Sequence, residues 1–273
     1  MQWDKVKNTL IVILLAVNLF LMGSLGAKLW QDRQREQMLL DNLTRLLAHA
    51  GLTLDEDFAL PRGKVLPLLS LDRSRAGEEA VAAAMLGEEV ARTEQEDGAA
   101  RFESRTGTLE WRADGTVRAA CLLEGNMPTD ERQALSRARG LLADWGLLGE
   151  EVTLAADGLR VTVTGTLAGQ PVYNRSLELR FDRGCVMLSG RWSFGTPYTT
   201  VRGDGTTYAA ADALLAFAAA APEGARIRVM TAGYRLQLDG SRRLQLVPTW
   251  KINTDSGEYL VDCAKKTMVA QEN

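Results

Sequence analysis

Histidine is almost absent from this sequence of 273 residues, which contains only His49. Devices that pair a serine or cysteine nucleophile with a histidine base need that base inside the folded site. His49 lies in a predicted stalk helix, outside the domain that would hold such a site. Most hydrolase mechanisms are therefore excluded, and we expect that the protein is not an enzyme.

Cysteine is scarce, with Cys121, Cys185 and Cys263 in three separate apolar stretches. They lack the paired spacing that metal clusters and redox motifs use, and there is no phosphate-binding loop, so we expect neither a metal nor a cofactor. We interpret the three as small buried side chains, with one long-range disulfide as the alternative. A net charge of -3 offers no basic field, which argues against a nucleic-acid partner.

Paired carboxylates are the remaining catalytic device, because a glycosidase needs only two acidic side chains across a cleft. The candidate pairs are Glu88 with Glu89, Glu94 with Glu96, and Glu178 with Asp182. Acidic side chains are common on any solvated surface, so we favour a surface role for all of them.

Charge is missing from the run Thr9–Ala27, which Lys7 and Lys28 bracket. A helix of about 20 apolar residues can cross a hydrocarbon core of roughly 30 Å. We therefore predict a transmembrane helix over 9–29, preceded by a cytoplasmic tail over 1–8.

Two alternatives for this run stay open. It could be a buried core helix, although its polar positions are few. It could also be a cleaved signal peptide, because Ser24 and Gly26 put small residues near its end. Trp3 and Trp30 flank the run as indole rings flank many membrane spans, which favours the span.

The rest of the chain alternates helical and strand patterns. We predict a stalk helix over 30–54, an N-terminal α+β region over 55–127, a first helix-sheet module over 128–200 and a second over 201–273. Helical spacing predicts helices near 78–90, after Pro128 with Thr129 as its N-cap, and before Pro222. Strand patterns with Gly turns follow each of the last two helices. The expected class is α+β, with two tandem helix-plus-antiparallel-sheet modules.

Three stretches resemble a known family: MQWDKVKNTLIVILLAVNLFLMGSL, GQPVYNRSLELRFDRGCVMLSGRW and LVPTWKINTDSGEYLVDCAKKTMV. They are similar to the YycH/YycI family, most of all its YycI branch, whose members are accessory proteins of the WalK sensor kinase in Gram-positive bacteria. The third stretch also resembles the closing hairpins of PepSY-type modules. The residues of these motifs for which the resemblance implies a structural role are Pro171, Tyr173, Asn174, Trp192, Pro248, Trp250, Gly257, Tyr259 and Asp262.

The resemblance implies a single-pass protein of the cell membrane whose C-terminal domain lies outside the cytoplasm. It would bind and modulate a two-component sensor histidine kinase that controls cell-wall metabolism, together with a YycH-like protein. Either a homodimer or a heterodimer would be compatible with this role. The alternative function is a PepSY-like binding module that restrains a protease or binds a cell-wall ligand.

Within the predicted span, four residues are candidate partner-binding positions. Asn18 could donate a hydrogen bond to a neighbouring helix, and Gly23, Ser24 and Gly26 are small enough to permit close helix approach. Each could equally be a bystander without a role in binding.

Overall fold

The structure, a computed structural model, describes residues 3–61, 66–87, 89–149, 152–167, 169–199 and 209–269. The helices in these ranges are α1 (Trp3–His49), α2 (Arg75–Leu86), α3 (Glu131–Asp144) and α4 (Ala210–Ala218). Each helix predicted after residue 55 is confirmed within a few residues. The N-cap of α3 is Asp130 rather than the predicted Thr129, because the Asp130 carboxylate accepts the amide hydrogen of Gln133 at 2.8 Å.

Among the described residues, eight strands form a large antiparallel lobe with the spatial order β7-β8-β9-β10-β6-β5-β4-β3. We call it the large lobe. Its strands are β3 (Ala91–Glu94), β4 (Ala100–Glu103), β5 (Gly107–Trp111), β6 (Thr116–Leu122), β7 (Val152–Asp157), β8 (Arg160–Leu167), β9 (Gln170–Asp182) and β10 (Cys185–Arg191).

Seven strands form the small lobe, centred on the long β12–β13 hairpin. They are β1 (Thr53–Leu54), β2 (Leu69–Leu71), β11 (Pro197–Tyr198), β12 (Arg226–Leu238), β13 (Leu244–Thr254), β14 (Glu258–Asp262) and β15 (Thr267–Val269). A parallel pairing of Tyr234 in β12 with Val172 in β9 joins the two lobes, and the fifteen strands of the described ranges form one mixed sheet.

The predicted fold class, α+β with two tandem helix-plus-sheet modules, is wrong, because the strands of both parts belong to one continuous sheet. β6 pairs with β10 from Thr116 opposite Arg191 to Leu122 opposite Cys185. β2 likewise pairs with β13, far along the chain. Alternation in a sequence indicates that a strand exists, but it does not indicate which distant strand becomes its neighbour.

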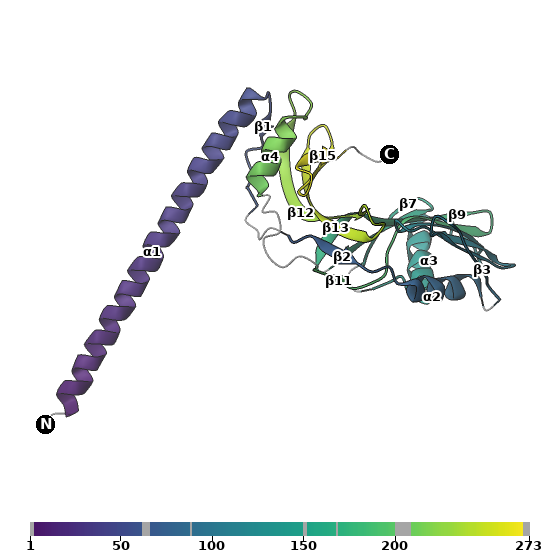
Figure 1. Ribbon diagram of the computed structural model, residues 1–273, viewed down its shortest axis with the longest axis horizontal. Coiled ribbons are helices and arrows are strands. Elements are labelled where there is room, and N and C mark those ends of the chain that lie inside the picture. The colour runs from purple at the N-terminus through teal and green to yellow at the C-terminus, as the bar shows by residue number, and fades with distance from the viewer. Residues whose placement is uncertain are drawn as a thin grey trace.

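The predicted transmembrane helix over 9–29 is also wrong. Within the part of the chain that the structure describes, no helix combines the length and the apolar character that crossing a membrane requires. The apolar run is one portion of the 47-residue helix α1, which continues through charged positions such as Lys28, Arg35 and Asp41. Figure 1 shows α1 diverging from the sheet, with only its C-terminal end against the small lobe.

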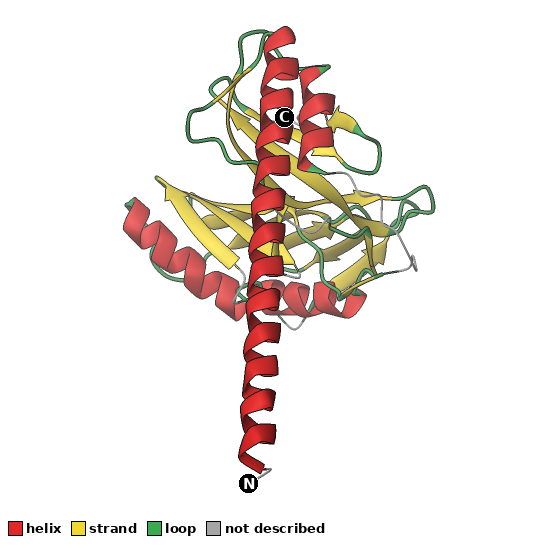
Figure 2. Ribbon diagram, turned by 90° about the vertical axis from the view of Figure 1, so that its left-hand side faces the viewer, coloured by secondary structure: helices red, strands yellow, loops and turns green. Residues whose placement is uncertain are grey.

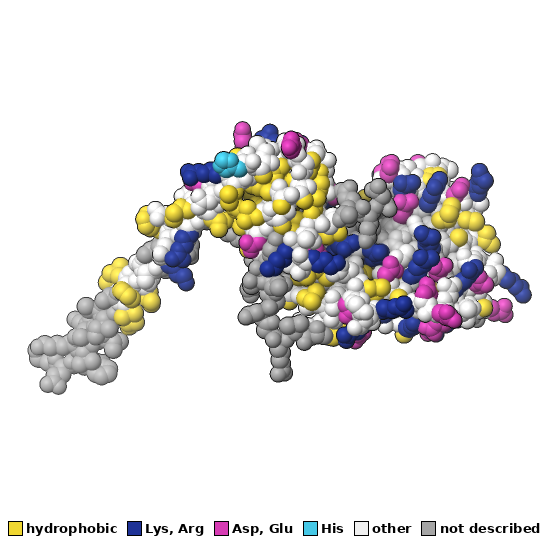
Figure 3. All heavy atoms as spheres, turned by 45° about the horizontal axis from the view of Figure 1, so that its top comes forward, with side chains coloured by type: hydrophobic (Ala, Val, Ile, Leu, Met, Phe, Trp, Pro, Cys, Tyr) yellow, Lys and Arg dark blue, Asp and Glu magenta, His cyan; other side chains and the backbone are white. Residues whose placement is uncertain are grey.

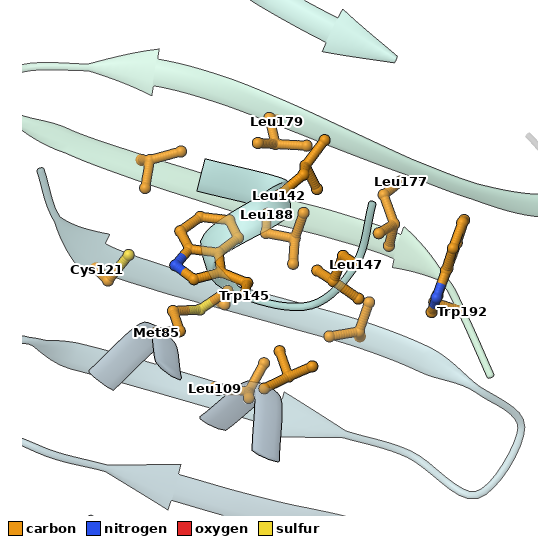
Figure 4. Packing of buried hydrophobic residues seen from close by; sticks show 14 of the residues in the cluster. Met85, Leu109, Cys121, Leu142, Trp145, Leu147, Leu177, Leu179, Leu188 and Trp192 are labelled. Carbon is orange, nitrogen blue, oxygen red and sulfur yellow. The ribbon is translucent and has the colours of Figure 1, made fainter. Parts of the chain in front are cut away.

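The main core lies between the large lobe and the two helices that cover one of its faces, α2 and α3 (Figures 1 and 2). In α3, Ala134, Ala138 and Leu142 recur at the spacing of one helix face and are fully buried. Trp145 and Leu147 continue this apolar surface beyond the helix end, as Figure 4 shows.

A second core fixes the end of α1. Leu43 and Leu47 pack with Leu214 and Phe217 of α4, above the strands of the small lobe. This contact sets where the long helix leaves the domain.

Candidate functional site

A cleft of about 330 Å³ opens where turns of the two lobes meet. The segment before α2, the β3–β4 and β5–β6 turns and the β12–β13 turn supply its walls. The residues that line it are Leu71, Asp72, Arg73, Arg75, Glu96, Asp97, Gly98, Ala113, Arg242, Arg243 and Leu244. Four arginines and three acidic residues therefore share one site, which we call the interlobe cleft.

Arg73 lines the interlobe cleft, and four hydrogen bonds hold its guanidinium in place. Its Nε and Nη2 donate to the two carboxylate oxygens of Glu78 at 2.5 and 2.8 Å. The same guanidinium donates to the carbonyl oxygens of Gly98 at 2.7 Å and Trp111 at 3.0 Å. Because 15% of the Arg73 side chain and 4% of the Glu78 side chain are exposed, this pair is structural. Arg73 thereby connects α2, the β3–β4 turn and the end of β5.

Arg75, Arg242 and Arg243 are the more accessible cations of the cleft. Arg75 lies 2.6 Å from a carboxylate oxygen of Glu94, and 37% of its side chain is exposed. Arg243 lies 3.5 Å from Asp239 and is 64% exposed. Ion pairs at this exposure contribute only about 0–1 kcal/mol each, so an incoming carboxylate can replace Glu94 or Asp239 at little cost.

The β12–β13 turn is built to hold its arginines in place. The carboxylate of Asp239 accepts the backbone amides of Ser241 and Arg243, each at 2.8 Å. The amide of Arg243 is the main cause that lowers the pKa of Asp239. Arg242 adopts a φ of 60°, the left-handed conformation that such a turn needs at this position.

The mixed charge of the interlobe cleft limits what it can bind. Asp72, Glu96 and Asp97 lie beside the arginines and would repel a purely anionic ligand. A polar protein segment that carries both signs of charge matches this arrangement better.

The predicted motif residues of β9 lie at the junction of the lobes rather than in the cleft. The Tyr173 hydroxyl donates to the carbonyl oxygen of Thr231 at 2.8 Å, and burial raises the pKa of Tyr173 to about 12. A Cβ on Gly233 would lie 2.7 Å from both the Pro171 oxygen and the Tyr173 ring. Only glycine at this position lets the two strands approach so closely, so this part of the motif is structural.

The two tryptophans among the motif residues are buried. Trp192 is 2% exposed, and its carbonyl oxygen accepts the Trp111 indole N–H at 3.1 Å. Trp250 is 6% exposed on β13, where the carbonyl oxygen of nearby Pro248 accepts the amide of Cys263 at 3.0 Å. This burial agrees with the structural role that the resemblance implies for both tryptophans.

The remaining motif residues shape the last two turns. Gly257 has a φ of 147° after β13, and the Tyr259 ring lies 5.2 Å from that of Phe217. The buried Asp262 carboxylate accepts the backbone amides of Ala264 and Lys265 at 2.8 and 2.9 Å.

The four candidate positions of the predicted span all lie in α1. Figure 1 shows the N-terminal half of this helix away from β2 and α2. Asn18, Gly23 and Ser24 are exposed, and the Ser24 hydroxyl donates to the Leu21 carbonyl at 2.9 Å. Gly26 lies in the same helix. Their partner-binding role stays a prediction.

Of the candidate carboxylates, Glu96 lines the interlobe cleft, whereas Glu94, Glu178 and Asp182 do not line it. Glu94 pairs with Arg75 and Glu178 with Arg160, the latter at 3.1 Å on the open face of the large lobe. Figure 3 shows acidic and basic side chains interspersed over this lobe. Glu88 lies outside the described residues, and among those described no cluster of histidine, cysteine and acidic side chains is arranged to hold a metal ion.

All three thiols are free. Burial raises the pKa of Cys121 to about 11 and that of Cys263 to about 12. Both are buried, as expected, whereas Cys185 is only partly covered.

The arginines of the interlobe cleft are the functional candidates that the sequence interpretation missed. A signal existed, because both turns carry an aspartate followed closely by two arginines, in DRSR over 72–75 and DGSRR over 239–243. The two segments are far apart in the sequence, so only the folded sheet brings them together.

Comparisons with known proteins identify no family for this chain. No protein-family model matches it, and no curated protein matches it. A solved structure of an uncharacterized protein from Eubacterium rectale is similar, with 9% identity, a TM-score of 0.38 and coverage of 81% of this chain and 91% of that one. The Bacillus megaterium YpeB C-terminal domain is similar at 10% identity and a TM-score of 0.37, over 77% of this chain and 100% of that one.

Likenesses with such low TM-scores assign neither family nor function. The resemblance to the YycI branch receives no support from these comparisons.

Proposed function

We propose that this chain is a non-catalytic regulator that binds a sensor histidine kinase of cell-wall control through the interlobe cleft. The kinase and a YycH-like protein enter this proposal through the resemblance of the motif stretches, as does a location outside the cytoplasm. The structural observation that carries the binding role is the pair of exposed cations Arg75 and Arg243, each held by a replaceable carboxylate.

The mechanism is a shift of populations between two kinase states. If acidic side chains of the kinase replace Glu94 and Asp239 in one state only, binding stabilises that state and the kinase equilibrium moves toward it. The weak internal pairs keep Arg75 and Arg243 oriented before the partner arrives, which reduces the entropy lost on binding.

Crosslinking in cells followed by purification of the tagged chain tests the choice of partner. The expected result is a histidine kinase, a YycH-like protein or both in the crosslinked material. Repeated preparations that contain neither would exclude this partner class.

Charge reversal tests the surface. Arg75→Glu combined with Arg243→Glu should weaken binding of the kinase's extracytoplasmic domain at least about tenfold, since each lost charged contact costs on the order of 1 kcal/mol. Arg118→Glu, on the exposed face of β6, is the matched control and should leave binding unchanged. Equal loss in the control would place the contact surface elsewhere.

A further inference from the structure

A second and smaller pocket of about 270 Å³ opens at one end of the large-lobe core. It lies between the segment that follows α3 and the ends of β8 and β10. The residues that line it are Gly146, Leu147, Leu148, Gly149, Val152, Thr166, Leu167, Arg175, Trp192 and Phe194. None of these lines the interlobe cleft. We call it the Arg175 pocket.

Arg175 is the one charged residue among the described residues that line this pocket. It is 8% exposed, its Nη1 donates to the Thr166 carbonyl oxygen at 2.8 Å, and its guanidinium carbon lies 3.8 Å from the centroid of the Trp192 ring. Holding a guanidinium among apolar walls is costly, and stacking on an indole offsets part of that cost.

The sequence makes room for this stacked pair. A Cβ on Gly165 would lie 2.7 Å from Arg175 Nη1 and 2.9 Å from the Trp192 ring. Any larger residue at this position of β8 would displace one of them, so Gly165 sets the position of the cation.

The opposite wall is fixed by aromatic packing. The Phe194 ring lies 5.4 Å from that of Trp111, and a Cβ on Gly77 of α2 would lie 2.9 Å from Phe194. Figure 4 shows Trp192 at the edge of the core cluster, on the side of Leu177. Walls held by core packing form a pocket before any ligand arrives.

We propose that the Arg175 pocket binds a small apolar carboxylic acid, with the carboxylate on Arg175 and the hydrocarbon part against Leu148, Val152 and Leu167. The planar guanidinium fork matches a carboxylate, and the remaining walls are mostly apolar. A volume of 270 Å³ holds about nine atoms if each takes roughly the 30 Å³ of a liquid water molecule. This inference is independent of the proposed kinase regulation.

Titration calorimetry with sodium octanoate on the full chain tests the proposal, and octylamine is the probe of opposite charge. Octanoate should bind at least about tenfold more tightly than octylamine, because the guanidinium attracts a carboxylate and repels an ammonium group. Arg175→Gln should weaken octanoate binding at least about tenfold. Arg180→Gln removes a guanidinium from the exposed face of the same strand and should leave the octanoate affinity unchanged.

A second variant keeps the test decisive if Arg175→Gln fails to fold. Leu148→Trp fills the pocket and leaves Arg175 in place, so octanoate binding should be lost while the circular dichroism spectrum is retained. Absent octanoate binding to the unchanged chain would overturn the proposal. So would equal affinities for octanoate and octylamine, or full binding by the filled variant.

Discussion

The side-chain amide of Asn174 forms two hydrogen bonds with the backbone of Leu236: its Nδ2 donates to the carbonyl oxygen at 2.8 Å, and its Oδ1 accepts the amide hydrogen at 2.8 Å. These bonds link β9 to β12, where the strands themselves pair directly at Tyr234 and Val172. One side chain thus supplies hydrogen bonds that strand pairing would otherwise provide, at the junction of the two lobes.

Asn174→Ala should therefore lower the free energy of unfolding by roughly 2–4 kcal/mol, because two part-buried backbone groups lose their partners. Asn174→Asp keeps an acceptor but sets a carboxylate oxygen against the Leu236 carbonyl oxygen, so it should also destabilise the fold. Urea unfolding measures both, with Asn126→Ala in an exposed loop as the control. A cost for Asn174→Ala no larger than for the control would show that other contacts hold the lobes together.

The buried pair of Arg73 and Glu78 leads to a second prediction. Glu78→Ala should cost about 3–5 kcal/mol of unfolding free energy, since it leaves the Arg73 guanidinium buried without its carboxylate. Glu79→Ala, one residue along the same helix, removes an exposed partner of Arg92 and should cost less than about 1 kcal/mol. Thermal unfolding of the two variants side by side makes the comparison, and equal shifts would contradict the structural role of Arg73.

Local features of the fold were predictable because their causes are local. The helices α2, α3 and α4 follow from apolar spacing, capping residues and the stop at Pro222. Even so, Asp130 and Thr129 compete as neighbouring N-cap residues, and the Asp130 carboxylate, three residues before Gln133, accepts the Gln133 amide hydrogen.

Long-range features were not predictable, because the residues that cause them lie far apart in the sequence. Asn174 reaches a partner 62 residues away, and Arg73 reaches a carbonyl 38 residues away in Trp111. The interlobe cleft and the continuous sheet both depend on such pairings, which leave no periodic trace in the sequence. The span predicted over 9–29 rested on the length of the apolar run and its flanking residues, and within the described residues no helix is long and apolar enough to cross a membrane.

The three cysteines should differ in reactivity. At pH 8, Ellman's reagent should modify Cys185 first in the native chain, because Cys121 and Cys263 are buried and burial raises their pKa values to about 11 and 12. Cys185→Ser should remove the fast phase. Equal rates for all three thiols in the unchanged chain would mean that the cores of both lobes open readily.

Acid should weaken the domain partly through Asp114 in the β5–β6 turn. Burial alone would raise its pKa, but hydrogen bonds from the Thr116 amide and hydroxyl at 2.9 and 2.8 Å, and from Arg191 at 3.3 Å, lower it below the ordinary value of 3.8. A carboxyl with a lowered folded-state pKa stabilises the fold above its unfolded-state pKa. That contribution is lost as the pH falls through the folded-state pKa.

Asp114→Asn should accordingly lower the free energy of unfolding by about 1 kcal/mol at pH 7, a modest value because a third of the side chain faces solvent. The difference between variant and unchanged chain should shrink as the pH falls below 3.8, where the native carboxyl also becomes neutral. Asp157→Asn at the exposed end of β7 is the matched control. Urea unfolding at pH 7, 4 and about 2.5 measures the effect, and a difference that stays constant across this range would assign the loss to packing instead of charge.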